Sequence, residues 1–244
     1  MSCRMITAIC AALLSLSVAT SWAAESNWPQ EPMSPDLHDL PSLQNGFKLY
    51  VNYCLGCHSL QYQRYERTAD DLGIPHDIAL ENLVFTDQKI GELMVSSMDP
   101  ESAKNWFGAP PPDLTMIARV RSPEWVYNYL KTFYADSSRP FGANNGMFPN
   151  VGMPNVLMSL QGVQELECSG EEPCTNLVVR EGSGSMSTEE FDQVAYDIAN
   201  FLYYVGEPSR LERQRLGIYV LLFLVILFVV VNLLAREYRK EVRH

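Results

Sequence analysis

The sequence is short of positive charge and of histidine. Its 244 residues include 18 Lys and Arg against 29 Asp and Glu, which gives a formal net charge of −11. Such an acidic chain has no excess of cations to neutralise phosphates, so nucleic acid is excluded as a partner. An acidic body would instead attract a basic protein partner over long range. The four histidines are scattered, and the sequence contains no internal repeat or low-complexity tract.

Long apolar runs are absent from the body of the chain and occur only near its two ends. The first run follows Arg4, extends over residues 5–18 and meets small residues at positions 21–23. This layout is typical of a cleaved secretory signal peptide, here 1–23 with cleavage after Ala23. An N-terminal membrane anchor is the alternative, but the run is too short to cross a bilayer comfortably.

The second apolar run covers residues 217–235, 19 positions without a charge, which is long enough to span a membrane. A buried core helix is the alternative, but basic residues flank the run on both sides, which favours a membrane anchor. A juxtamembrane segment, 211–216, precedes it and a cytoplasmic tail, 236–244, follows. The signal peptide exports the body, 24–210, which is therefore predicted to lie in the periplasm on the inner membrane of a bacterium. This body of roughly 180 residues has the size of one domain.

The six cysteines separate by position. Cys3 and Cys10 leave with the signal peptide. Cys54 and Cys57 are followed by a histidine, and Cys168 and Cys174 lie in a polar loop. Export to an oxidising compartment predicts a disulfide between the last two, and two free thiols are the alternative.

Residues 54–58, Cys-Leu-Gly-Cys-His, form the C-x-x-C-H pattern of covalent haem attachment. Thiols at this spacing can each add to one vinyl group of the same porphyrin, and His58 then reaches the iron. A thioredoxin-type redox pair is the first alternative, but it requires a strand before the motif, where a helix is predicted here. Half of a zinc site is the second, but no other cysteine pair has suitable spacing. The motif predicts one covalent haem c on Cys54 and Cys57.

A methionine is predicted as the second axial ligand of the iron. Met153, within Gly-Met-Pro, lies on backbone that the proline stiffens, and Met186, just ahead of the last soluble helix, is the second candidate. Their spacing alone does not choose between them. The other ring nitrogen of His58 should donate to a carbonyl that fixes the ring. The proline run in residues 109–113 offers free carbonyls for this contact, and a merely stiff turn is the alternative.

Apolar periodicity predicts a mainly α fold. Ser42 is the expected N-cap of a helix whose apolar positions lead to Cys54 at its C-terminal end. Ser187 and Glu190 have the spacing of a capping box, and an apolar face then continues to Gly206 in the last soluble helix.

The rest of the body is predicted to be irregular. Residues 24–41 are rich in proline and should lie extended along the body, and prolines interrupt the long stretch 59–149. Short helices are expected at 87–97 and 123–134. So much loop in one compact domain requires something other than regular structure to fill the core, and a haem would do so.

With these residues in place, the chain resembles the cytochrome c1 family, the haem subunits of cytochrome bc1 complexes, over nearly its whole length. Gly46 and Tyr50 stand eight and four residues before Cys54, like the positions at which class I cytochromes c cross their first and last helices. Residues 111–115 are similar to the P-P-D-L-S segment of the family, and residues 148–154 resemble its axial methionine loop.

The resemblance implies a fold and roles for individual residues. It implies a class I cytochrome c-like haem domain with long irregular loops and one C-terminal transmembrane helix. Met153 matches the axial methionine, and Pro112 lies in the matching cofactor-binding segment. Arg121, nine residues after Pro112, matches an arginine that pairs with a haem propionate, and Arg119 is the alternative if the register shifts.

The resemblance also implies an electron-transfer subunit of a quinol:cytochrome c reductase, not a catalyst by itself. It would accept an electron from a Rieske iron–sulfur protein and pass it to a soluble cytochrome c. Cytochrome b and membrane lipid would lie beside its anchor in a dimeric multi-subunit complex. A peroxidase-like haem enzyme is one alternative, but His38 and His76 are isolated in polar segments and offer no distal acid–base pair. A cytochrome subunit of another respiratory complex is the other.

Overall fold

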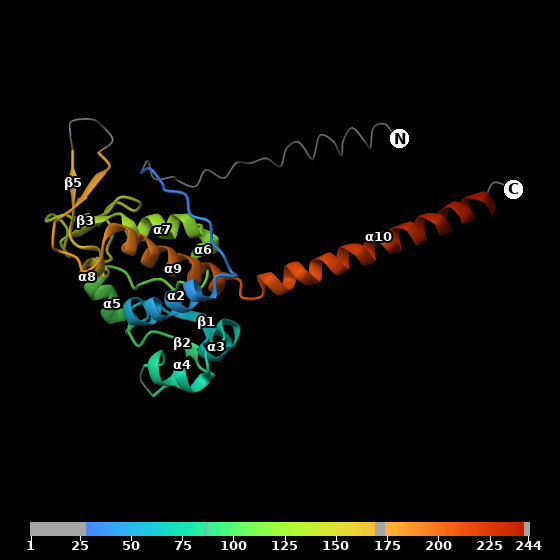
Figure 1. Cartoon of the computed structure of the whole chain (residues 1–244), viewed down its shortest axis with the longest axis horizontal. Helices are drawn as coiled ribbons and strands as arrows, with labels where there is room; N and C mark the ends of the chain where they lie inside the picture. Colours follow the sequence, from blue (N-terminus) through green and yellow to red (C-terminus); the bar gives the residue numbers. More distant parts are fainter. Residues whose placement is uncertain (1–27, 86, 169–173, 242–244) are drawn as a thin grey trace.

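The computed structural model describes residues 28–85, 87–168 and 174–241. The predicted signal peptide, 1–23, lies outside the described residues, as do the last three positions of the predicted tail. Figure 1 shows a body of helices and loops from which one long helix departs. The helices are α2 (Leu40–Tyr53), α3 (Tyr65–Leu72), α4 (His76–Asn82), α5 (Pro100–Phe107), α6 (Ile117–Val120), α7 (Pro123–Lys131), α8 (Met158–Gln161), α9 (Thr188–Gly206) and α10 (Arg210–Glu241).

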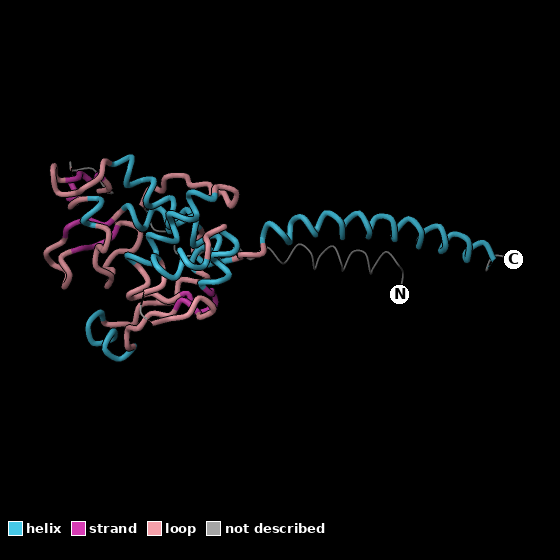
Figure 2. Tube along the Cα trace, turned by 60° about the horizontal axis from the view of Figure 1, so that its bottom comes forward, coloured by secondary structure: helices cyan, strands magenta, loops and turns pink. Residues whose placement is uncertain are grey.

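Strands in the described part of the chain are short and pair only two by two. Each pair is antiparallel, and Figure 2 shows that loops connect most elements of the body. The predicted mainly α fold with long irregular loops is therefore confirmed. The three pairs are β1 (Leu60–Arg64) with β2 (Leu93–Met94), β3 (Phe133–Ala135) with β4 (Ala143–Asn145), and β5 (Gln164–Glu167) with β6 (Asn176–Val179).

Helix α9 lies at the centre of the body, where it packs against α2, α6 and α7. It begins with the predicted capping box: the Ser187 hydroxyl accepts from the Glu190 amide at 3.2 Å, and the Glu190 carboxylate accepts from the Ser187 amide at 2.8 Å. The helix ends at Gly206, as predicted. Its apolar side chains, including Ile198 and Phe201, are buried in the main core.

Helices α2 and α9 approach each other most closely at Gly46. A Cβ atom at this position would lie 2.1 Å from the carbonyl oxygen of Asp197 and 2.6 Å from the Cβ of Phe201. The rings of Phe47 and Tyr50 pack on the Phe201 ring, with centroid distances of 5.4 and 5.8 Å. The helix crossing that Gly46 and Tyr50 predicted is therefore confirmed, and only glycine fits at its centre.

The predicted N-cap of α2 is wrong by three residues. Asp39 caps the helix, since its carboxylate accepts from the Ser42 amide at 3.1 Å. The buried Ser42 hydroxyl instead donates to the Asp197 carboxylate at 2.7 Å, and the Asn45 amide donates to the same carboxylate at 2.7 Å. Ser42 does not cap its own helix because its hydroxyl bonds across to α9.

The helix predicted at residues 87–97 is absent. This segment forms turns and the short strand β2, because two of its carbonyls accept hydrogen bonds from the first amides of helix α3. Helix α3 has no side-chain cap, and its first amides, those of Tyr65 and Glu66, donate to the carbonyls of Glu92 and Ile90 at 3.2 and 2.7 Å. A segment that caps a neighbouring helix with its own carbonyls cannot use them for a helix of its own.

The remaining predictions for the body are largely confirmed. The helix expected at 123–134 is α7, which ends at Lys131 because the next residues join strand β3. The N-terminal segment lies along the body from Trp28 onward without regular structure. The Asn128 side chain holds it by accepting from the Glu31 amide and donating to the Glu31 carbonyl, both at 2.8 Å.

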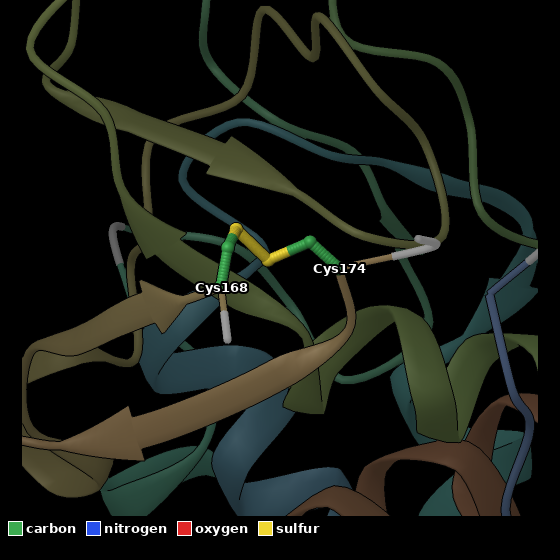
Figure 3. The surroundings of a disulfide bond; sticks show 2 residues. All are labelled: Cys168 and Cys174. Carbon is green, nitrogen blue, oxygen red and sulfur yellow. A yellow bond between two sulfur atoms is a disulfide. The ribbon is translucent and has the colours of Figure 1, made fainter. Parts of the chain in front are cut away.

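The predicted disulfide between Cys168 and Cys174 is confirmed, with Cα atoms 5.2 Å apart (Figure 3). It joins the chain just after β5 to the chain just before β6, strands that pair in register from Gln164 with Val179 to Glu167 with Asn176. The bond therefore fastens the end of this hairpin.

Helix α10 leaves the body with its apolar side chains exposed. Residues 210–240 form a helix that is long and apolar enough to cross a membrane. The helix includes residues 211–216, which were predicted as a juxtamembrane segment. Glu207, whose side chain is 14 % exposed, lies between body and helix and pairs with Arg119 at 2.9 Å and Arg213 at 2.5 Å.

Replacement of Gly46 by alanine should strongly destabilise the body. The added methyl group meets backbone atoms of α9 that cannot move aside, so we expect a loss of about 2–3 kcal/mol in the free energy of unfolding. Guanidinium titration of the detergent-solubilised chain measures it. Gly91→Ala is the matched control, because its Cβ would meet only the end of the Glu66 side chain at 3.6 Å. Equal stability of the two variants would contradict the close crossing.

Candidate functional site

A cavity of about 460 Å³ lies inside the body, bordered by the end of α2, the proline run, α7, the 148–156 loop and α9. This volume falls within the range of about 300–1,000 Å³ that is usual for small-molecule sites, and the lining is mainly apolar. All the predicted site residues line it together: Cys54, Cys57, His58, Pro112, Arg121 and Met153.

The end of helix α2 directs the cysteine motif into the cavity. Cys54 is the C-cap residue, and its carbonyl accepts from the amides of Cys57 at 3.0 Å and His58 at 2.8 Å. This tight turn places all three side chains on the cavity wall. The Tyr50 hydroxyl supports the turn by donating to the His58 carbonyl at 2.5 Å.

Burial makes ionisation of both motif thiols less favourable. Burial, and then the nearby Cys57, raise the pKa of Cys54 to about 12, and burial also raises the pKa of Cys57. Zinc binding and disulfide exchange both require thiolates, which lowered pKa values favour. The raised pKa values do not fit the thioredoxin-type alternative, and the described residues contain no group of three or more His, Cys, Asp or Glu side chains placed to hold a metal ion.

His58 is oriented by the proline run. Its Nδ1 lies 2.7 Å from the Pro112 carbonyl oxygen, and because a carbonyl can only accept, Nδ1 carries the proton and Nε2 is left as the lone-pair donor. Burial lowers the pKa of His58, against the opposing effects of the Pro112 carbonyl and the Asp113 charge. A neutral imidazole with a free Nε2 is the form that ligates a metal.

The Pro112 carbonyl is itself held in place by its neighbours. The Asp113 carboxylate accepts from the Gln61 amide at 2.8 Å and from the Thr115 amide at 3.0 Å. The Leu114 amide donates to the Ser59 carbonyl at 2.9 Å, which ties the proline run to the chain just after His58. The expectation that this run meets His58 is thus confirmed at Pro112.

Of the two candidate methionines, Met153 lines the cavity, whereas Met186 packs against the main core. The loop before Met153 approaches α5 closely, since a Cβ at Gly152 would lie 3.0 Å from the Phe107 carbonyl oxygen. The Tyr129 hydroxyl donates to the Met153 sulfur at 3.4 Å. The geometry therefore favours Met153 as the sulfur donor of this cavity.

The two candidate arginines also differ in position. The Arg121 guanidinium borders the cavity and lies over the Trp125 ring, 5.3 Å from its centroid. Arg119 faces the anchor instead and pairs with Glu207. Arg121 is therefore the one that can meet an anionic group of a ligand in the cavity.

One known protein family matches this chain over nearly its whole length. The family model described as "Cytochrome C1 family" matches residues 28–242.

The chain belongs to the cytochrome c1 family.

A cytochrome c1 from Allochromatium vinosum is 52 % identical over 217 residues, covering 87 % of this chain and 89 % of the relative. A protein of Nitrosomonas europaea named ammonia monooxygenase gamma subunit is 42 % identical over 95 % of this chain and 96 % of the relative. A cytochrome c1 from Rhodobacter capsulatus is 25 % identical over 94 % of both chains. Members of the cytochrome c1 family carry a covalent haem c and are anchored by a C-terminal helix, and α10 is a helix of that kind here.

The residues present fit haem c. The cavity combines two thiols at the attachment spacing, an oriented imidazole, a thioether and one guanidinium in an otherwise mainly apolar wall. His58 is the only histidine among the described residues that line the cavity. His76 at the start of α4 instead contacts Asp70 of α3 at 2.8 Å, so it offers no distal acid–base group to a cytochrome c1 site.

Two lining residues, Trp125 and Tyr129, were not predicted from the sequence. Trp125 and Tyr129 are four residues apart within α7, so they share one face of that helix, and this face borders the cavity. This spacing was the signal that could have identified them.

Removal of the Asp113 carboxylate should loosen the segment that holds Pro112 against His58. Asp113→Ala loses both hydrogen bonds to backbone amides, and we expect a decrease of about 2 kcal/mol in the free energy of unfolding. Asp113→Asn keeps one acceptor oxygen and should lose about half as much. Guanidinium titration of both variants measures this, and an alanine variant as stable as the parent would rule out the role of Asp113.

Proposed function

We propose that this chain is the electron-transfer subunit of a quinol:cytochrome c reductase. The observation that carries the proposal is that two thiols, an oriented imidazole and a thioether line one cavity of suitable size. A bound haem c supplies one-electron exchange between the ferrous and ferric states of its iron. The protein residues hold it, orient it and keep other ligands from the iron.

Each residue of the site has a distinct role in this proposal. The Cys54 and Cys57 thiols would hold the cofactor through thioether bonds to its two vinyl groups. His58 Nε2 and the Met153 sulfur would be the two protein ligands of the iron, which would leave no ligand position for a substrate. A His/Met pair favours a raised potential. Arg121 would hold a propionate, whose negative charge its guanidinium would compensate.

The location follows from the two ends of the chain. Residues 1–23 act as the signal that exports the body, 24–210, to the periplasm. Residues 217–235 cross the bacterial inner membrane among its lipids, and the tail, 236–244, stays in the cytoplasm. The proposal is supported by the exposed apolar surface of α10 and by the disulfide between Cys168 and Cys174, which suits an oxidising compartment.

The partners in this proposal are those of a dimeric multi-subunit complex. Cytochrome b lies beside α10, a Rieske iron–sulfur protein delivers the electron, and a soluble cytochrome c receives it. The net charge of −11 supports attraction of a basic soluble cytochrome. The name of the Nitrosomonas relative makes a subunit of another oxidoreductase the second candidate, with the same haem site in a different assembly.

Replacement of Met153 by leucine should remove the thioether ligand. We expect the reduction potential to fall and the ferrous iron to bind carbon monoxide, which optical titration of the detergent-solubilised chain detects. Met186→Leu is the matched control, because Met186 packs against the main core instead of lining the cavity. Carbon monoxide binding in the Met186 variant with an unchanged Met153 variant would assign the ligand to Met186.

Removal of the segment after Arg215 should separate haem binding from turnover. We expect a soluble protein that keeps covalent haem, visible as haem stain on a denaturing gel, but no longer couples quinol oxidation to cytochrome c reduction. With the full chain, cytochrome b should co-purify in mild detergent, and reduction of the soluble cytochrome should slow as salt rises. A native preparation that contains subunits of another oxidoreductase and no cytochrome b would favour the second candidate.

A further inference from the structure

Tyr129 connects helix α7 to the candidate axial sulfur. Its hydroxyl lies 3.4 Å from the Met153 sulfur and donates to it. A thioether sulfur has two lone pairs, so one can bind the iron while the other accepts from a hydroxyl. We propose that Tyr129 is a positioning residue, which holds the Met153 sulfur at the iron and raises the reduction potential through this hydrogen bond. The inference rests on the proposed role of Met153 as ligand.

The Tyr129 ring is held in place by two neighbouring aromatic rings. It stacks on the Trp125 ring, with centroids 4.9 Å apart and an angle of 17° between the planes, and it meets the Phe133 ring edge-on at 5.2 Å. The Asn145 side chain donates to the Tyr129 carbonyl at 2.8 Å and fixes the backbone there. A ring held in this way presents its hydroxyl in one direction, so the hydrogen bond does not depend on a flexible side chain.

The same stack reaches the other polar group of the cavity. The Arg121 guanidinium lies over the Trp125 ring at 5.3 Å, so Arg121, Trp125, Tyr129 and Met153 form a continuous column along one wall. Trp125 therefore packs against both the Arg121 guanidinium and the Tyr129 ring, whose hydroxyl donates to the sulfur. Packed side chains therefore connect the guanidinium and the thioether of the cavity wall.

The direction of the effect follows from charge. The hydroxyl points the positive end of its dipole toward the sulfur, and the ferric site carries one more positive charge than the ferrous site. The hydrogen bond therefore disfavours the ferric state. A net hydrogen bond changes an equilibrium by a factor of about 2–10, so removing the hydroxyl should shift the ferrous–ferric equilibrium toward ferric by a factor in that range.

Tyr129→Phe tests this proposal, because it removes only the hydroxyl and preserves the ring that packs on Trp125 and Phe133. The matched control is Tyr127→Phe on the same helix, since the Tyr127 hydroxyl contacts Lys131 at 3.1 Å and its side chain is not part of the cavity wall. Redox titration of the full, haem-loaded chain in detergent measures the midpoint potential of each variant. We expect a lower midpoint for Tyr129→Phe alone, with normal covalent haem content in both variants.

Three outcomes would overturn the proposal or locate the failure. A parental midpoint in Tyr129→Phe, together with carbon monoxide binding in Met153→Leu, refutes the role of Tyr129 and leaves the proposed function intact. Equal shifts in the Tyr127 and Tyr129 variants refute a specific hydrogen bond. An unchanged spectrum in Met153→Leu refutes the ligand assignment itself, and the Tyr129 proposal falls with it.

Discussion

The close approach of α2 and α9 at Gly46 is the contact on which the rest of the structure depends. A helix crossing without intervening side chains brings backbone to backbone, and the Ser42 and Asn45 side chains complete it by donating to the buried Asp197 carboxylate. Cys54 lies two turns farther along the same helix. The position of the cysteine motif is therefore set by the crossing and not by the loops around it, because a shift of α2 along α9 would move the motif out of the cavity.

Loops complete the site from the other directions, and specific hydrogen bonds restrict them. Asp113 fixes the proline run, which in turn orients His58, and the close contact of Gly152 with the Phe107 carbonyl fixes the approach of the Met153 loop. Proline stiffens both loops around their functional atoms. Near the cavity, specific contacts therefore fix the positions of the loops as well as those of the helices.

Much of this arrangement could be predicted from the sequence because its signals are local. The cysteine motif, the capping box of α9 and the anchor each depend on residues close together in the chain. The helix expected at 87–97 failed because its carbonyls cap α3, a contact across sequence that periodicity does not record. The Ser42 cap failed for the same reason, since its hydroxyl bonds to α9. The choice of Met153 over Met186, and of Arg121 over Arg119, likewise needed three-dimensional positions.

Glu207 links the body to helix α10 through two ion pairs. This largely shielded carboxylate binds Arg119 on the body and Arg213 on α10, so the junction is crossed by ion pairs as well as by the chain. Arg119 is only two residues from Arg121 on the cavity wall. The two ion pairs therefore favour one orientation of the body, and of its cavity, relative to the axis of α10.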